Sequence, residues 1–184
     1  MMFSGKYDSP FEPGASLVAF DPAVHLPLLR SLTDQNPFTL TDQDRARLDV
    51  LYDDVIKAPN AMMFAVQADD RCLGVIYFTE IEIGLNAWIH AYGVPGCCSV
   101  FAAAKGMRVA LDAAFGAWGL MRVSTVHAMG NRVSTAICER AGFKQEGLIR
   151  SVRMYQGEAH DCWLGGIIRG EWHAGRHPAQ AVAA

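Results

Sequence analysis

The chain has 184 residues, 51% of them hydrophobic and 19% charged, and its formal net charge is −3. These values are typical of one globular domain and exclude a long disordered or fibrous chain. No apolar run approaches the roughly 18 residues that a membrane span needs. No secretory signal is recognisable after Met1, so we expect a cytoplasmic protein without a membrane partner.

The charges and the cysteines narrow the classes of ligand. Residues 1–60 carry five Lys and Arg against nine Asp and Glu, whereas residues 104–154 carry eight against three. A basic segment in an acidic chain suits a small anionic ligand better than a long nucleic acid. The five cysteines lack the spacing of a zinc site, so we expect reduced, mostly buried thiols and no metal.

The first third of the chain predicts an arm, a strand and two helices. Residues 1–15 are rich in Gly, Pro and Ser, which is typical of an arm, and residues 16–20 form a short apolar strand. A helix is expected to open at Asp21. A second helix begins at Thr41, a good N-cap, carries apolar residues at helical spacing and ends before Pro59.

The middle of the chain predicts three strands and a long amphipathic helix. Residues 61–67 and 72–79 are separated by a turn and form a hairpin, and residues 86–92 form a third strand. A loop with two glycines follows. Apolar residues then recur every three to four positions from Val100 to Trp118, which predicts a helix that ends near Gly119.

The last third predicts a strand, a helix and a hairpin. Residues 121–128 form the strand, residues 131–141 form a helix that Gly142 stops, and residues 143–154 and 159–169 form the hairpin. The expected order is β-α-α-β-β-β-α-β-α-β-β. This order predicts an α/β (α+β) fold with a mixed, mostly antiparallel central sheet and helices on both faces.

The expected domain covers residues 16–173, between an N-terminal arm at residues 1–15 and a flexible tail at residues 174–184. Within it, the strand, loop and helix at residues 86–118 form the first candidate site. The N-terminus of a helix presents unpaired backbone N–H groups and a positive dipole end, which suit phosphate. Gly93 and Gly96 would allow a ligand to approach the backbone closely.

An ordered set of short motifs in the second half is more specific than any single motif in it. The motifs are Leu111-Asp-Ala-Ala-Phe115, Gly119-Leu-Met-Arg122, Asn131-x-x-Ser134, Glu139-Arg-x-Gly142-Phe143, Glu146-Gly147, Arg150, Asp161, Gly165 and Arg169-x-Glu171-Trp172. Together they resemble the GNAT superfamily of N-acetyltransferases and are similar to its ribosomal-protein and N-terminal-amine branch. The resemblance covers roughly residues 61–172.

The resemblance implies acetyl-CoA, or another acyl-CoA, as the cofactor. Its pantetheine arm would pair with the strand at Ile89 and Ala91, and Asn131 and Ser134 match positions that touch the cofactor in relatives. The reaction implied is direct attack of an amine on the thioester carbonyl. The residues expected around the pyrophosphate are Gly93, Gly96, Cys98, Ser99, Val100, Phe101, Ala102 and Ala103.

Two positions depart from the pattern of the family. The phosphate loop of relatives reads Arg/Gln-x-x-Gly-x-Gly/Ala, whereas this chain has Cys98 to Ala103, with Phe101 at the first glycine position. A side chain of this size would crowd a pyrophosphate. Cys138 stands where many relatives carry a tyrosine acid, and a thiol can donate a proton but matches neutral pH less well.

The candidate bases are Glu80, Glu82 and His90. His90 lies near the end of the third strand, and an unperturbed histidine pKa near 6.5 suits proton removal. Glu80 and Glu82 share one face of the chain and could bind the amine of a cationic substrate. His127 ends the next strand and ranks below them. Structural roles stay open for each: a half-buried strand histidine, a solvated strand end, and capping for Asn131 and Ser134.

The sequence therefore predicts an enzyme, a CoA-dependent N-acyltransferase acting on a primary amine of a small molecule or a protein. One alternative is a cofactor-free binding or regulatory protein on the same fold, which the altered phosphate loop motivates. Another is an acyltransferase for nucleic acid or aminoacyl-tRNA, which the negative net charge does not favour. A homodimer is open, because exposed strands often pair across such interfaces.

Overall fold

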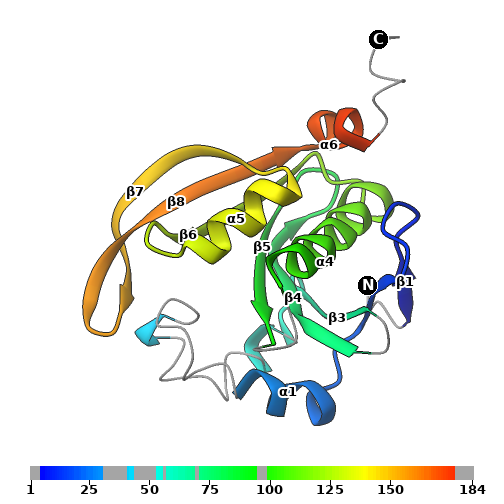
Figure 1. Cartoon of the computed structure of the whole chain (residues 1–184), viewed down its shortest axis with the longest axis horizontal. Coiled ribbons are helices and arrows are strands. Elements are labelled where there is room, and N and C mark those ends of the chain that lie inside the picture. The colour runs from blue at the N-terminus through cyan, green and yellow to red at the C-terminus, as the bar shows by residue number, and fades with distance from the viewer. Residues whose placement is uncertain are drawn as a thin grey trace.

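The structure is a computed structural model, and it describes residues 5–30, 41–43, 53–55, 57–68, 71–94 and 99–176. The strands of this part form one eight-stranded sheet in the order β1-β2-β3-β4-β5-β6-β8-β7. Only the β5–β6 pair is parallel among these strands (Figure 1). The bounds are β1 Lys6–Asp8, β2 Ala15–Ala19, β3 Met62–Ala68, β4 Arg71–Glu82, β5 Asn86–Gly93, β6 Arg122–Ala128, β7 Lys144–Tyr155 and β8 Glu158–Ile168.

Helices cover both faces of the sheet, as the sequence predicts. Helices α4 and α5 pack against each other on one face, and α1 contacts β4 from the opposite face (Figure 1). The predicted mixed, mostly antiparallel sheet is confirmed. The helical bounds are α1 Pro22–Arg30, α4 Val100–Asp112, a π-helical turn Ala113–Ala117, α5 Arg132–Ala141 and α6 Arg169–Arg176.

Strand alternation divides the core into two layers. Phe64, Ile76 and Ile89 point to the α4 face, where they pack in the main hydrophobic cluster. Val75 and Tyr77, on the neighbouring positions of β4, point the other way and pack in a separate cluster. A residue's parity along β4 or β5 therefore decides which face of the sheet its side chain reaches.

Local sequence explains how α4 and α5 begin and end. Ser99 caps α4, because its hydroxyl accepts a hydrogen bond from the Ala102 amide at 3.2 Å. Asn131 caps α5 in the same way through the Ser134 amide, at 3.1 Å. Gly142 ends α5 with φ of 98°, a left-handed conformation that glycine adopts without a steric penalty.

The sheet opens between its two parallel strands. The β5–β6 ladder runs from Asn86 and Arg122 only as far as Trp88 and Ser124. Beyond Trp88, β5 continues to Gly93 beside β4, while β6 continues beside β8. The facing edges of β5 and β6 are therefore not paired with each other past this point.

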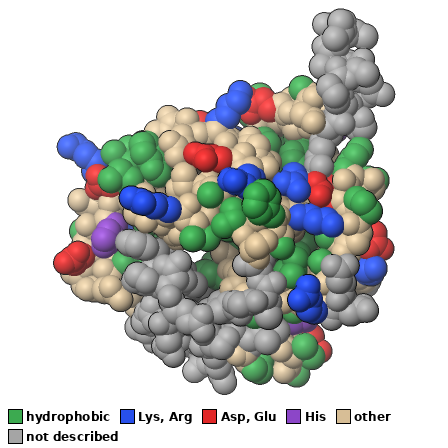
Figure 2. Space-filling view, viewed as in Figure 1, with side chains coloured by type: hydrophobic (Ala, Val, Ile, Leu, Met, Phe, Trp, Pro, Cys, Tyr) green, Lys and Arg blue, Asp and Glu red, His purple; other side chains and the backbone are tan. Residues whose placement is uncertain are grey.

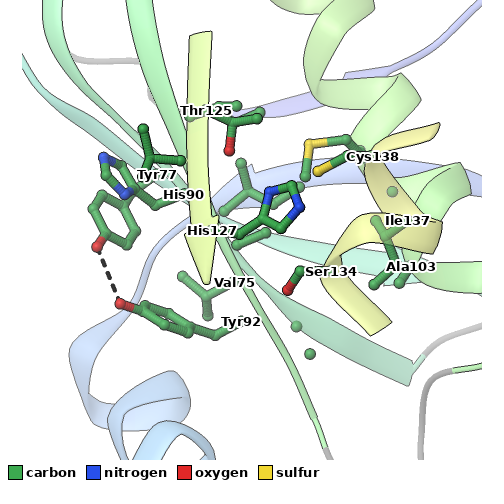
Figure 3. A pocket seen from close by; sticks show the side chains of 18 of the residues that line it. Val75, Tyr77, His90, Tyr92, Ala103, Thr125, His127, Ser134, Ile137 and Cys138 are labelled. Atoms are coloured by element: carbon green, nitrogen blue, oxygen red, sulfur yellow. Dashed lines mark hydrogen bonds between the residues drawn. The ribbon is translucent and has the colours of Figure 1, made fainter. Parts of the chain in front are cut away.

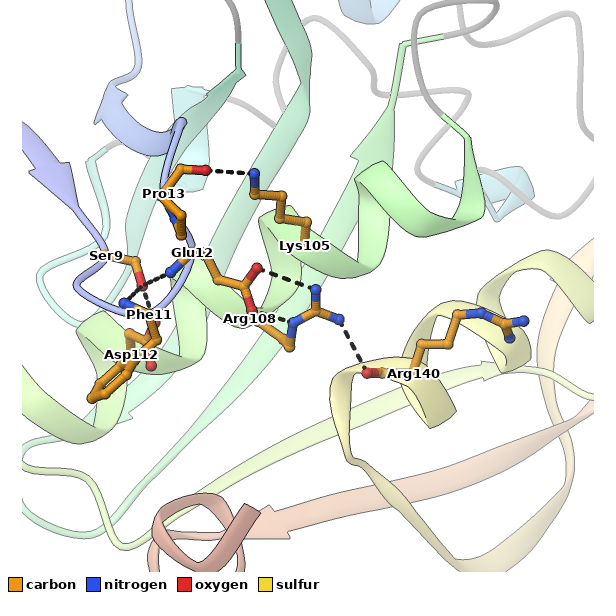
Figure 4. A network of polar contacts seen from close by, with 8 residues as sticks. All are labelled: Ser9, Phe11, Glu12, Pro13, Lys105, Arg108, Asp112 and Arg140. Atoms are coloured by element: carbon orange, nitrogen blue, oxygen red, sulfur yellow. Dashed lines mark hydrogen bonds and ion pairs between the residues drawn. The ribbon is translucent and has the colours of Figure 1, made fainter. Parts of the chain in front are cut away.

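The N-terminal segment is ordered rather than an arm in its described part. Residues 6–8 pair with β2, and the loop after them packs on α4 (Figure 4). Ser9 donates a hydrogen bond to Asp112, and Glu12 forms an ion pair with Arg108 at 2.5 Å. Lys105 reaches the Pro13 carbonyl at 2.6 Å. The Gly, Pro and Ser residues after Asp8 thus form the turn between β1 and β2 and are not part of a free arm.

Other differences lie at element ends. Helix α6 is absent from the prediction, yet Trp172 is buried and packs against Phe115, with ring centroids 6.0 Å apart. The predicted helix after Thr41 lies mostly outside the described residues; of it, residues 42–43, 53–55 and 57 are helical. No helix of the described part is long and apolar enough to cross a membrane.

Candidate active site

A cavity of about 400 Å³ occupies the opening between β5 and β6 and is lined from both faces of the sheet. On the α4–α5 face its walls include Ala103, Ser134 and Cys138. On the opposite face they include Tyr77 and His90. Figure 3 shows these two groups of side chains on either side of the cavity. We call them the helix-side compartment and the opposite compartment.

The helix-side compartment contains several residues that the sequence assigns to cofactor binding. Ile89, Ala91 and Gly93 line the cavity from the unpaired part of β5, and Asn131 and Ser134 line it from the start of α5. The capping role that the sequence leaves open is present for Asn131, whose side-chain oxygen accepts from the Ser134 amide. Capping and contact with the cavity are thus compatible.

The structure describes only part of the expected phosphate loop. Gly96 and Cys98 lie outside the described residues, whereas Ala102 and Ala103 line the cavity. Phe101 does not crowd it: its side chain is 71% exposed and lies under the Arg140 guanidinium, 4.9 Å from the ring centroid. Val100 and Ser99 lie beside it at the helix start, away from the cavity lining.

Cations gather next to this helix start. A second, shallower hollow is lined by Ser99, Phe101, Lys105, Arg108 and Arg140. Figure 2 shows Lys and Arg side chains grouped on the face that α4 and α5 present. Three of the eight cations of the basic segment thus lie beside the N-terminus of α4, where the helix dipole is also positive, although Arg108 is paired with Glu12.

The hydrogen bonds of His127 fix its tautomer. Thr135 must donate its one hydroxyl hydrogen to the Asn131 carbonyl, 3.1 Å away, because a carbonyl can only accept. The Thr135 oxygen therefore accepts from Nε2 of His127, also at 3.1 Å. Nδ1 is then a buried acceptor that has no partner among the residues that the structure describes, and the His127 side chain lines the cavity. Burial lowers the pKa of His127, so the ring is mostly neutral at neutral pH.

The opposite compartment is built around His90. Its ring stacks on Tyr77, with centroids 4.5 Å apart and planes 10° from parallel. Its Nε2 lies 3.1 Å from the Thr79 hydroxyl oxygen, and the hydroxyls of Tyr77 and Tyr92 lie 3.2 Å apart. Arg153 completes this side from β7. All of these side chains share one face of β4, β5 and β7.

The surroundings of His90 change its acid–base behaviour. Burial, reinforced by the positive charge of Arg153, lowers the pKa of His90 to about 4. Both causes disfavour the charged imidazolium. His90 is therefore neutral at pH 7, as a proton acceptor must be, but it is a weaker base than the unperturbed histidine that the sequence suggests.

A β-bulge separates the two candidate glutamates. The β4–β5 register shifts between Thr79 and Glu82, and Glu80 has a φ of 51°, in the left-handed region. Glu80 lines the cavity with an exposed side chain, while Glu82 pairs with Asn86 and does not line it. The structure therefore brings Glu80, but not Glu82, to the site.

Cys138 lines the helix-side compartment and belongs to the main core. Burial raises the pKa of its thiol to about 12. A thiol in water has a pKa of about 8.5, so proton transfer from Cys138 to another thiolate is uphill. Its surroundings suit packing better than proton donation.

The sequence did not point to Arg153, Tyr77 or Thr79, and it placed Tyr92 on the face of His90 but favoured a core or rim position for it. Parity along the strands offered one signal, because Tyr77 and Thr79 alternate on β4 as His90 and Tyr92 do on β5. For Arg153 the sequence contains no comparable signal. Arg153 lies on the edge strand β7, which is placed in the sheet by its pairing with β8, and the pattern of a single strand does not reveal that pairing.

Comparison with protein-family models and with curated protein sequences gives no match. Solved structures do match. Spermidine N-acetyltransferase from Vibrio cholerae in complex with CoA and spermine is similar with a TM-score of 0.73 and 19% identity, over 86% of this chain and 98% of that chain. RimJ from Mycobacterium smegmatis in complex with CoA-disulfide gives 0.73 and 21%, over 94% of each chain.

A third solved structure is also similar to this chain. RimL, a ribosomal L7/L12 alpha-N-protein acetyltransferase in complex with coenzyme A, gives a TM-score of 0.69 at 20% identity, over 86% of this chain and 96% of that chain. The fold implied by the motifs from Leu111 to Trp172 is thereby confirmed. The protein has the fold of the GNAT N-acetyltransferases.

Proposed function

We propose that the protein is an enzyme that transfers an acetyl group from acetyl-CoA to a primary amine. The observation that carries the proposal is the cavity between β5 and β6, which is lined from both faces of the sheet. One compartment adjoins the N-terminus of α4 and the other contains the neutral His90. Acetyl-CoA supplies the acetyl group as an activated thioester.

The residues of the helix-side compartment fit a pantetheine arm. Pantetheine carries two amides, and β5 presents an edge from Ile89 to Gly93 that β6 does not pair. Nδ1 of His127 is a buried acceptor that no described residue satisfies, and an N–H group of a ligand would satisfy it. Asn131 and Ser134 add polar atoms on the facing helix.

The start of α4 fits the phosphates of the cofactor. Ser99 satisfies the amides of Ala102 and Ala103 through its hydroxyl and its carbonyl. The amides of Val100 and Phe101, at the first two helical positions, have no acceptor within the helix. These amides and the cations of the adjoining hollow, Arg140 among them, would hold the phosphates without a glycine-rich loop.

The opposite compartment would handle the proton of the amine. An amine attacks only after it loses a proton, and His90 is neutral and oriented by Thr79 and Tyr77. Its low pKa makes it a weak acceptor, so the rate should rise with pH as the amine itself deprotonates. Glu80 is exposed at the cavity and is the second candidate. We assign no proton transfer to Cys138.

Isothermal titration with acetyl-CoA tests the proposal. Wild type should bind, and Ser134→Trp should lose binding because the indole fills the cavity from α5. Val133→Trp is the matched control: the neighbouring side chain is 52% exposed and does not line the cavity. It should bind like wild type. Circular dichroism would confirm that both variants are folded.

The outcomes separate enzyme from binding protein. No heat with wild type at millimolar acetyl-CoA would contradict the proposal and favour a cofactor-free protein on the same fold. Equal binding by both tryptophan variants would place the cofactor outside the cavity. Release of free CoA thiol in the presence of an amine, above the rate of hydrolysis, would then establish transfer.

A further inference from the structure

Arg153 lies in the opposite compartment and forms no ion pair with any residue that the structure describes. It lies on β7, two residues before Tyr155, so both side chains share one face of the strand. Tyr155 is buried against Ala128 on the face of β6 away from α5. Arg153 is half-buried and lines the cavity on this side.

Two other half-buried arginines, Arg108 and Arg122, have carboxylate partners that Arg153 lacks. Arg108 pairs with Glu12 at 2.5 Å, and Arg122 makes a forked pair with Glu146. Among the described residues, Arg153 has no recorded ion pair or hydrogen bond. A partly buried guanidinium keeps donors that only an anion or a set of acceptors can satisfy.

The charge of Arg153 acts where the amine would react. His90 faces it across the cavity, and the proximity of the guanidinium contributes to the low pKa of that ring. Tyr77, Tyr92 and Thr79 are neutral, and Glu80, the one carboxylate of the described lining, is exposed. The compartment thus offers a positive inner wall, which disfavours polycations and favours a ligand with a negative group.

We propose that the acceptor is a small amine that also carries an anionic group, a carboxylate or a phosphate, which pairs with Arg153. The inference rests on the proposed function and specifies its acceptor. The guanidinium fork matches either group through two parallel hydrogen bonds. The anion would hold the molecule so that its amino group lies beside the neutral His90.

Matched acceptor pairs test this directly. Each pair differs by one anionic group: an α-amino acid and its amide, or phosphoethanolamine and ethanolamine. Spermidine serves as a polycation. CoA release gives kcat and KM, and calorimetry on the CoA-saturated protein gives acceptor binding without turnover. The carboxylate and phosphate arms identify which anion is used.

The variants are Arg153→Met, which keeps an unbranched apolar stem but removes the guanidinium, and Arg150→Met as a control. Arg150 lies on the same strand but is exposed and does not line the cavity. Wild type should prefer the anionic member of a pair. Arg153→Met should raise KM and Kd for that member by about tenfold to a hundredfold and leave the neutral member unaffected. Arg150→Met should change neither value.

Three results would overturn the inference. One is that no anionic amine binds or is acetylated by wild type. Another is that spermidine or the neutral members are used as well or better. The last is a preference for anions that survives in Arg153→Met. Failure of acetyl-CoA to bind wild type would instead remove the proposed function itself, so a separate titration with acetyl-CoA distinguishes the two.

Discussion

His90 is the side chain whose chemistry depends most on its surroundings. It lies between the Tyr77 ring and the Thr79 hydroxyl, and the pKa of its imidazole is lowered to about 4. In the unfolded chain a histidine titrates near pH 6.5. The folded protein therefore binds fewer protons at this residue than the unfolded chain does between these two values.

This difference predicts how stability depends on pH. The depressed pKa leaves the folded state unaffected above pH 6.5, but stability falls as pH drops from 6.5 towards 4, because only the unfolded chain takes up the proton. His90→Gln retains a polar side chain and does not titrate. Melting temperatures from pH 7.5 to 4.5 should therefore fall less steeply for His90→Gln than for wild type.

Other groups also titrate between pH 7.5 and 4.5. The test is therefore the difference between wild type and His90→Gln in how steeply the melting temperature falls with pH. His25 and His127 have lowered pKa values as well, and they remain in both proteins. Parallel slopes for wild type and His90→Gln would show that His90 is not desolvated in the folded state. The argument for a neutral, weakly basic His90 would then fail.

At the scale of elements, the contact of α4 with β3 sets one wall of the cavity. Gly106 lies on the inner face of α4, and a Cβ built there would be 2.7 Å from Cγ1 of Val66. Both residues line the cavity. A side chain at position 106 would therefore push α4 away from the sheet, because Val66 is buried and its branched side chain has little room to move.

We predict that Gly106→Ala lowers the free energy of unfolding by about 1–3 kcal/mol and weakens acetyl-CoA binding. Urea denaturation and calorimetry measure the two effects. Gly116→Ala is the control, because nothing lies within 4 Å of a Cβ at that position. Adding Val66→Ala to Gly106→Ala should restore part of the acetyl-CoA affinity. An unchanged stability of Gly106→Ala would mean that the helix can shift without cost.

Sequence periodicity predicted most elements because their patterns are local. Alternation along Asn86–Gly93 and the cap at Asn131 followed by Gly142 gave β5 and α5 nearly to their ends. Strand β1 was not predicted, because it is short and its conformation depends on pairing with β2. Helix α6 was not predicted either, because its sequence, with two glycines, has weak helix propensity, and the burial of Trp172 stabilises it.

In the whole molecule, residues of the candidate site that belong to local sequence patterns could be predicted, and residues placed by long-range pairing could not. The helix-side compartment could be predicted, because Asn131 and Ser134 belong to the motifs of the GNAT resemblance and Ile89 follows from the strand that the resemblance assigns to the cofactor. In the opposite compartment His90 and Glu80 could be predicted, whereas Arg153 and Tyr155 could not, since they reach it through the pairing of β7 with β8. The placement of Arg153 and Tyr155 beside His90 therefore required the three-dimensional structure.

The β7–β8 hairpin is also held at its tip by a distant segment. The carboxylate of Asp42 accepts hydrogen bonds from the amides of Gln156 and Gly157, each at 2.7 Å. Thr41, next to Asp42, is buried and lines the cavity. The segment around Asp42 and the tip of the β7–β8 hairpin, more than 100 residues apart in sequence, thus lie next to each other beside the cavity. The proposed acceptor would bind near this contact.

A crystal structure of the protein grown with saturating acetyl-CoA would locate the cofactor. We predict electron density for the pantetheine arm between β5 and β6, next to Ile89 and His127, with the phosphates at the start of α4. Density for the cofactor anywhere else, or an empty opening between these strands at saturating acetyl-CoA, would contradict this prediction.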